Sequence, residues 1–193
     1  MSEVKNILLC GVGGQGIILA SKILATGLIK AGYDVKMSEV HGMAQRGGSV
    51  TTQVRFGEKV YSPIIGKGQA DVLVSFEKME TPKWLDFVKS TGRVVINDYE
   101  IPSALILSGA KEYPQGVIED ISGKINTTVF KAAEMAEELG NIKTMNVIVV
   151  GALVKAMGLE GIVDWSEVIA ETVKAKFVDI NIEAFNLGAS QVH

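Results

Sequence analysis

The stretch Lys5-Asn-Ile-Leu-Leu-Cys-Gly-Val-Gly-Gly-Gln-Gly-Ile-Ile-Leu-Ala20 decides the fold. A short apolar run ends in a cluster of glycines, and an apolar stripe with helical spacing then runs from Ile17 to Leu28. Strand, tight turn and helix in this order predict the first half of a βαβ unit. The N–H groups that open such a helix carry the positive end of its dipole, so they favour a phosphate or a carboxylate.

The glycine cluster fits the pattern G-x-G-x-x-G, which is found at many dinucleotide sites. Its candidate cofactor-binding residues are Gly11, Gly13, Gly14, Gln15 and Gly16. The usual companion is an acidic residue about 20 positions further on, and Glu39 lies near that place. The same pattern also lets a helix pack closely on its strand or on a neighbouring subunit. Both interpretations stay open at this point.

Short apolar strands alternate with helices along the rest of the chain. Strands are predicted over 34–38, 49–56, 71–75 and 93–97, with a turn at 57–59 leading to a hairpin partner at 60–62 and a short strand at 116–119. Helices are predicted over 17–31, from 81 to before Gly92, and over 128–139, 144–157, 164–177 and 180–187. A right-handed crossover would place strand 34–38 parallel to the first strand.

This alternation predicts an α/β fold. The expected architecture is a Rossmann-like open, mostly parallel sheet with an antiparallel hairpin or edge and helices on both faces. We expect residues 1–193 to form one domain.

Composition excludes several classes of function. The formal net charge of −3 gives no general attraction for nucleic acid or an anionic membrane. No apolar run approaches the roughly 18 residues of a spanning helix, and the first residues lack the plan of a signal peptide. Cys10 is the only cysteine, so we expect no disulfide, no cysteine-ligated cluster and no metal site. The chain is expected to be cytoplasmic.

A second glycine segment, His41-Gly-Met-Ala-Gln-Arg-Gly-Gly-Ser49, follows the second predicted strand. It should therefore lie at the carboxyl edge of the sheet, beside the first glycine loop. His41, Gln45 and Arg46 are candidates for a pocket or an interface, because Arg46 can fork onto an anion and His41 can donate a hydrogen bond or move a proton. The interface candidates are Gly42, Met43, Gly47 and Gly48. The simpler alternative is a polar loop that caps the sheet edge. No nucleophile, base and orienting group can be assembled, so no residue is assigned as catalytic.

The two glycine segments, together with Tyr61-Ser-Pro63 and Ala70-Asp-Val-Leu-Val74, carry a resemblance that runs from end to end. The chain resembles the gamma-type subunits and domains of 2-oxoacid:ferredoxin oxidoreductases. The His-Gly-Met-Ala-Gln-Arg form is similar to that of the small (beta) subunits of the indolepyruvate branch. The pyruvate, 2-oxoglutarate and ketoisovalerate relatives remain the alternative.

The resemblance implies a subunit that is inactive alone and binds no cofactor tightly. A large partner subunit would hold thiamine diphosphate, Mg²⁺ and [4Fe-4S] clusters. The assembly would oxidatively decarboxylate an arylpyruvate with coenzyme A and reduce ferredoxin. We expect the two glycine segments to dock near the thiamine site, with Gln45 and Arg46 completing the wall of the substrate or coenzyme A pocket. A stand-alone nucleotide-binding Rossmann protein, a pure assembly scaffold and a homodimer of the chain alone are alternatives that stay open.

Overall fold

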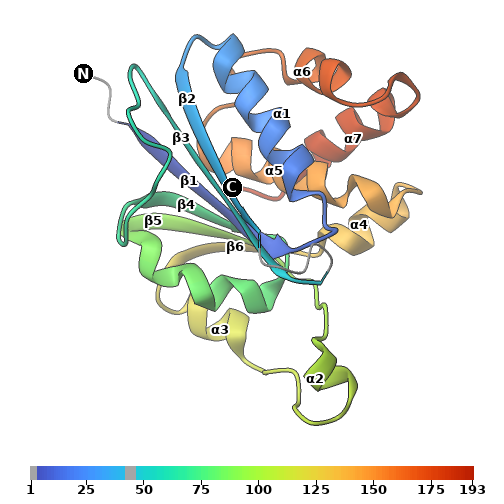
Figure 1. Cartoon of the computed structure of the whole chain (residues 1–193). Coiled ribbons are helices and arrows are strands. Elements are labelled where there is room, and N and C mark those ends of the chain that lie inside the picture. The colour runs from blue at the N-terminus through green and yellow to red at the C-terminus, as the bar shows by residue number, and fades with distance from the viewer. Residues whose placement is uncertain (1–3, 42–46) are drawn as a thin grey trace.

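The computed structural model describes residues 4–41 and 47–193, which form a six-stranded sheet with helices on both faces (Figure 1). The strands are β1 (Lys5–Val12), β2 (Asp34–His41), β3 (Ser49–Gly57), β4 (Ala70–Ser75), β5 (Val88–Asn97) and β6 (Asn126–Phe130). The α-helices are α1 (Ile17–Lys30), α2 (Ala104–Leu107), α3 (Val117–Ser122), α4 (Ala132–Glu138), α5 (Met145–Ala156), α6 (Trp165–Thr172) and α7 (Val178–Ala189). The 3₁₀ segments are η1 (Lys78–Phe87), η2 (Ile142–Thr144) and η3 (Ala175–Phe177). No helix in the described ranges is both long and apolar enough to cross a membrane.

The strand order is β2-β3-β1-β4-β5-β6, and only β3 runs against its neighbours. The predicted α/β class, with a mostly parallel sheet and antiparallel strands at one edge, is therefore confirmed. Because β1, β2, β4 and β5 all run the same way, the segments that follow them leave the sheet at a single edge. We call this edge the carboxyl edge.

Alternate residues of the central strands enter two cores. Ile7 and Leu9 face the layer of α1, α4, α5, α6 and α7, whereas Leu8 and Cys10 face η1 and α3. This alternation follows from the two-residue period of a strand, and both faces are covered, which explains the unbroken apolar run in β1. Helix α5 lies between the sheet and α7, and it is buried all round as predicted.

The position of the second strand in the sheet differs from the prediction. β2 runs in the predicted direction but does not pair with β1, because β3 lies between them. The expected wet face of β3 is also wrong, since Thr51 and Gln53 are buried. Residues 58–69 cross this face and bond to it: the Gln53 Oε1 accepts from Ile65 N at 2.6 Å, and the Arg55 guanidinium donates to Ser62 O at 2.8 Å. The 60–62 hairpin partner is absent, and those residues form a covering loop.

Two helix starts differ from expectation for local reasons. Residues 126–130 form β6 rather than the start of a helix, because Thr127, Thr128 and Val129 are β-branched, and the helix begins only at α4. The helix expected from Thr81 is instead the 3₁₀ segment η1, which begins earlier because the Glu77 side chain accepts from Glu80 N at 3.0 Å.

The remaining differences concern element type and length. The short strand expected at 116–119 is wrong, because Val117–Ser122 forms α3. The Asp164 cap is confirmed, with its side chain accepting from Ser166 N at 2.8 Å and Glu167 N at 3.4 Å, but α6 ends at Thr172 rather than 177. Helix α7 is longer than the predicted 180–187.

Candidate functional site

The first glycine loop connects the end of β1 to α1 at the carboxyl edge. Gly16 is the residue before the helix and has φ +77°, a left-handed conformation that glycine adopts without strain. Within residues 4–41 and 47–193, no side chain caps this helix, and its first turn contains no acidic residue. The first N–H groups of an α-helix have no partner within it, so the start of α1 presents uncompensated donors.

The second glycine segment meets the first, as the sequence predicts. Gly13 N donates to Gly48 O at 2.8 Å, and Gly47 N donates to Gly13 O at 3.3 Å. Ser49 then donates to the buried Glu80 carboxylate at 2.6 Å, which ties the segment to η1. His41 ends β2. The candidates Gly42, Met43, Gln45 and Arg46 lie outside the described residues.

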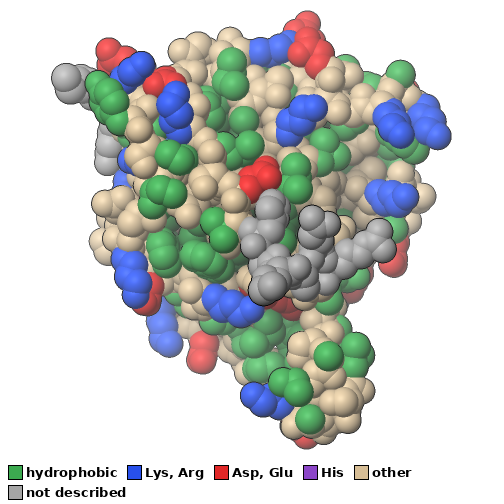
Figure 2. All heavy atoms as spheres, viewed as in Figure 1, with side chains coloured by type: hydrophobic (Ala, Val, Ile, Leu, Met, Phe, Trp, Pro, Cys, Tyr) green, Lys and Arg blue, Asp and Glu red, His purple; other side chains and the backbone are tan. Residues whose placement is uncertain are grey.

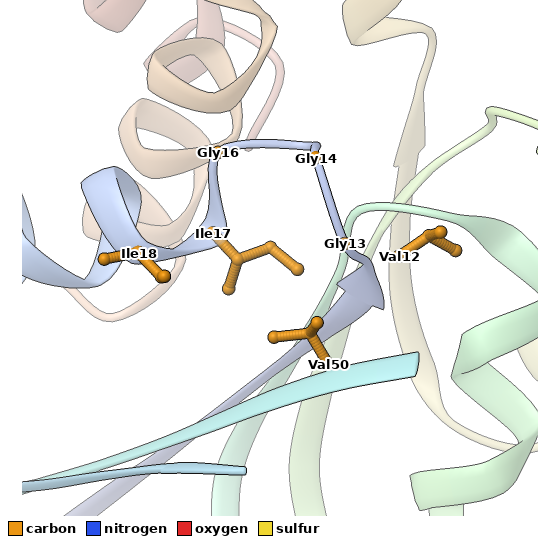
Figure 3. Close-up of a pocket in the computed structure, with 7 residues that line it drawn as sticks. All are labelled: Val12, Gly13, Gly14, Gly16, Ile17, Ile18 and Val50. Carbon is orange, nitrogen blue, oxygen red and sulfur yellow. The ribbon is translucent and has the colours of Figure 1, made fainter. Parts of the chain in front are cut away.

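Two cavities flank the first glycine loop. One has a volume of about 280 Å³ and is apolar, with Ile17 and Val50 below the loop backbone and Val12 and Ile18 to either side of them (Figure 3). The other has a volume of about 580 Å³ and lies between the loop, the start of α1 and the start of α5. Its lining includes Gly13, Gly14, Gln15, Gly16, Leu19, Tyr99, Ile101, Ile142, Lys143, Met145 and Asn146.

The larger cavity combines an apolar body with positive polarity at one end. Helix α1 begins there with no acidic residue in its first turn, whereas α5 continues directly from η2, whose first turn is capped by the Asn141 side chain accepting from Lys143 N at 3.1 Å. Lys143 adds a full positive charge to the lining, while Tyr99 and Ile101 supply apolar surface. Such a cavity suits an elongated ligand with an anionic group.

Asn146 is a site residue that sequence reasoning missed. Its Nδ2 donates to Gly16 O at 3.1 Å, and a Cβ at Gly16 would lie 2.5 Å from that nitrogen. Its Oδ1 is buried without a partner among the described residues. The available signal was one amide within the buried, otherwise apolar residues 145–154, where an unpaired polar group is costly.

Gly11 and the side-chain amide of Gln15 lie inside the loop, although Gln15 also contributes to the lining of the larger cavity. Gln15 is 8% exposed, and its side-chain amide bonds to the backbone at Val12 and Phe76. A Cβ on Gly11 would lie 2.7 Å from Gln15 Oε1 and 2.8 Å from the Phe76 Cβ. Gly11 therefore makes room for the amide of Gln15, whereas Gly13, Gly14 and Gly16 line the cavities.

Glu39 does not occupy the position that a dinucleotide fingerprint requires. It pairs with Thr52 of β3, and β3 separates its strand from β1. Two strand spacings amount to about 10 Å, so the carboxylate lies one strand further from the glycine loop than a ribose hydroxyl would need. The interposed strand thus argues against the stand-alone nucleotide-binding interpretation.

A charged cluster occupies the same edge beyond β4 and β5. Glu77 is 1% exposed and accepts from Tyr113 Oη and from Ile101 N at 3.4 Å. Burial raises the pKa of Glu77, although these hydrogen bonds favour its charged form. Lys78 pairs with Glu100 and, at 3.4 Å, with Asp98. Partial burial opposes the charge of Lys78, but these carboxylates raise its pKa overall.

This cluster holds the base of residues 98–116, which we call the arm. The arm projects from the body of the molecule and carries α2, and Figure 2 shows hydrophobic side chains over it. Leu105 and Leu107 are 55% and 76% exposed.

The described residues offer no group of three or more metal-ligating side chains. Cys10 is fully buried beneath the glycine loop, donates to Ser75 Oγ at 3.4 Å, and has its pKa raised to about 12 by burial. A thiol so protected is a poor nucleophile.

Comparisons with known proteins agree on one family. The model for the family described as pyruvate ferredoxin/flavodoxin oxidoreductase matches residues 6–191. The indolepyruvate oxidoreductase subunit IorB of Pyrococcus horikoshii is 41% identical over 190 residues, which are 95% of this chain and 93% of that protein.

Two solved structures share the fold. The gamma subunit of a keto/oxoacid ferredoxin oxidoreductase from Geobacter sulfurreducens is 25% identical, with a TM-score of 0.70 and 97% of each chain covered. A 2-oxoglutarate:ferredoxin oxidoreductase from Magnetococcus marinus, with 2-oxoglutarate, coenzyme A and succinyl-CoA bound, is 21% identical, with a TM-score of 0.73. The match covers 99% of this chain and 31% of the Magnetococcus marinus chain. The chain therefore belongs to the pyruvate ferredoxin/flavodoxin oxidoreductase family, as a gamma-type subunit of its indolepyruvate branch.

Proposed function

We propose that this chain is the small, cluster-free subunit of an indolepyruvate:ferredoxin oxidoreductase and that its carboxyl edge docks on a large subunit. That large subunit would hold thiamine diphosphate, Mg²⁺ and the [4Fe-4S] clusters. The assembly would convert an arylpyruvate and coenzyme A to an acyl-CoA and CO₂, with two electrons passing to ferredoxin. Support comes from the 41% identity to an indolepyruvate oxidoreductase subunit over nearly the whole chain.

The observation that carries the proposal is the cavity of about 580 Å³ at the carboxyl edge. Backbone N–H groups at the start of α1 suit a phosphate, Lys143 adds a positive charge, and the apolar wall suits an extended chain. Coenzyme A has both features. We infer that the small subunit forms one wall of the coenzyme A pocket and that the large subunit forms the other.

Assembly tests the first part of the proposal. The chain should co-purify with its large subunit, and the pair should reduce a low-potential dye when indolepyruvate and coenzyme A are both added. Either subunit alone should give no steady turnover. Pyruvate, 2-oxoglutarate and ketoisovalerate serve as competing substrates, and a kcat/KM higher for one of them would reassign the branch. Steady turnover by the small chain alone would overturn the proposal.

Lys143 tests the coenzyme A pocket. In the assembled enzyme, Lys143→Met should raise the KM for coenzyme A about tenfold, because a charge-assisted contact to a phosphate is lost, and leave the KM for indolepyruvate unchanged. Lys22→Met is the matched control, since Lys22 is exposed on α1 and lines neither cavity. Equal KM values for coenzyme A in the two variants would show that the larger cavity is not part of the coenzyme A pocket.

Arg46 and Gln45 are proposed from the sequence as the remaining wall of this pocket. Arg46→Ala, assembled with the native large subunit, should raise the KM for the 2-oxoacid or for coenzyme A. A variant that assembles less tightly but turns over normally once assembled would favour a pure scaffold role for the second glycine segment.

A further inference from the structure

The side chain of Gln15 lies within the glycine loop and uses both ends of its amide. Gln15 Oε1 accepts from Val12 N at 2.8 Å, and Gln15 Nε2 donates to Phe76 O at 2.7 Å. One amide thus joins the loop that follows β1 to the segment that follows β4. A neutral amide fits here because one neighbour is a donor and the other is an acceptor.

The Phe76 carbonyl is also shared with a second buried amide. Asn97 Nδ2 donates to Phe76 O at 3.0 Å and lies 3.4 Å from Met145 Sδ, while Asn97 Oδ1 accepts from Ala132 N at 2.9 Å. Asn97 is fully buried. The two amides therefore form a continuous chain, which we call the amide chain, from the glycine loop across β4 and β5 to the starts of α4 and α5.

The glycine loop is shaped around this chain. A Cβ on Gly11 would lie 2.7 Å from Gln15 Oε1 and would displace the amide, so glycine is needed at this position. Because the Gln15 side chain turns inward, the loop offers the cavities mainly backbone from Gly13, Gly14 and Gly16. The conformation of the loop is therefore held on one side by Gln15 and, at Gly13, also by the bonds to Gly47 and Gly48.

We propose that Gln15 is a positioning residue: its amide holds the glycine loop, residues 13–16, in the conformation that lets the loop and the start of α1 bind the anionic part of the ligand. This inference rests on the proposed function for the ligand's identity, but its geometry belongs to this chain alone. The glycine motif by itself suggested that Gln15 contacts the ligand directly. In this proposal Gln15 acts through the backbone of the loop instead. The glycine loop then binds through its backbone, and the conformation of that backbone is held by a side chain whose amide is bonded to Val12 and Phe76.

A positioning role requires one hydrogen-bond acceptor and one donor at this side chain, and a residue that only fills space would not need them. A carboxylate at this position accepts from Val12 N but turns a second oxygen toward Phe76 O, which repels it. A protonated carboxyl group can do what the amide does, because its hydroxyl donates to Phe76 O while its carbonyl accepts from Val12 N. Gln15→Glu should therefore be defective at high pH and restored as the pH falls.

The test uses Gln15→Met, Gln15→Glu and a control, Gln53→Met, each as the full chain assembled with its large subunit. Gln53 is also 8% exposed and accepts one buried N–H, from Ile65, but it lies in β3 away from the loop lining. Two quantities are measured between pH 5.5 and pH 8: amide hydrogen exchange of residues 12–18, and the KM for coenzyme A separately from kcat.

The expected results distinguish the three variants. Gln15→Met should speed exchange of residues 12–18 and raise the KM for coenzyme A by about tenfold at every pH, with kcat within about twofold. Gln15→Glu should match Gln15→Met at pH 8 and approach the native enzyme as the pH falls. Gln53→Met should alter neither quantity, even where it lowers the melting temperature.

Exchange of residues 12–18 decides the positioning role. Native exchange rates in Gln15→Met would overturn it, and so would a Gln15→Glu variant whose exchange rate, relative to the native enzyme at the same pH, does not change with pH. The KM for coenzyme A decides the proposed function separately. Faster exchange in Gln15→Met with an unchanged KM would keep the positioning role and overturn the assignment of the loop to the coenzyme A pocket.

Discussion

Two regions of the carboxyl edge hold their segments by opposite means. The glycine loop and the starts of α4 and α5 are joined by the neutral amides of Gln15 and Asn97. The arm is held at its base by charged groups, chiefly Glu77 and Lys78. Neutral hydrogen bonds in a buried place are insensitive to salt and pH, whereas the charged cluster responds to both. We infer that the geometry of the glycine loop next to the proposed pocket stays constant when salt or pH changes, whereas either change can loosen the base of the arm.

The largest effect is expected at the amide chain. Asn97→Leu leaves the buried Ala132 N–H without a partner and weakens the bonding of Phe76 O, so the free energy of unfolding should fall by about 3 kcal/mol. Urea titration measures the loss, which should be the same at pH 5.5 and pH 8. Asn181→Leu is the control, because Asn181 makes one bond within α7's first turn, to Phe177 O at 2.7 Å, and should cost about 1 kcal/mol. An equal loss in the free energy of unfolding for Asn97→Leu and Asn181→Leu would contradict the larger role given to the amide chain.

The next effect is expected at the base of the arm. Tyr113→Phe removes a hydrogen bond to the buried Glu77 carboxylate, and a bond to a charged group contributes about 1.5 kcal/mol. The amides of residues 99–101 should then exchange about tenfold faster, while those of residues 12–18 stay at their native rate. Tyr61→Phe, at a tyrosine that is 90% exposed, should change neither. Faster exchange in the glycine loop would show that the two regions are coupled.

A smaller, pH-dependent effect is expected from Glu77→Gln. In the variant one of the two acceptor oxygens becomes an NH₂ group, so Glu80 N and Tyr113 Oη compete for the remaining oxygen, and the variant should be about 1 kcal/mol less stable than the native chain at acid pH. Burial raises the folded-state pKa of Glu77, so its contribution to stability is complete below the unfolded-state pKa and is lost as the pH rises through the folded-state value. The deficit of Glu77→Gln should therefore shrink from acid to neutral pH. A deficit that grows over this range would contradict the assignment.

The smallest effect is expected for Lys78→Met. This substitution removes the ion pairs to Asp98 and Glu100, and partly exposed pairs contribute about 0.5 kcal/mol. The loss should disappear in about 1 M salt, where screening acts within roughly 3 Å. Thermal unfolding at low and high salt measures it. A loss that persists in high salt would mean that Lys78 acts by packing, for example over the Tyr113 ring, 5.2 Å from its Nζ.

Much of the fold could be predicted because its signals are local. The apolar run before the glycines, the all-apolar helix α5 and the Asp164 cap each depend on neighbours within a few residues. The place of β3 could not be predicted, because strand order depends on which strands meet across the sheet. The same long-range contacts bury Thr51 and Gln53, whose alternation had indicated a wet face.

The candidate site divides in the same way. Sequence spacing indicated that Gly47 and Gly48 would meet the first glycine loop, and the bonds to Gly13 show that they do. It could not show that Gln15 faces inward, because the partners of its amide include Phe76, which is 61 residues away. Asn146, 130 residues from Gly16, was missed for the same reason.

By itself, the amino-acid sequence determined the α/β class, the helix start at the glycine loop and the family resemblance, because these depend on residue type and spacing over short stretches. Only the tertiary structure decided that β3 separates Glu39 from β1 and that buried amides support the glycine loop from behind. The physical reason is that a hydrogen bond between distant segments leaves no periodic trace in the chain, although it determines where the backbone donors point.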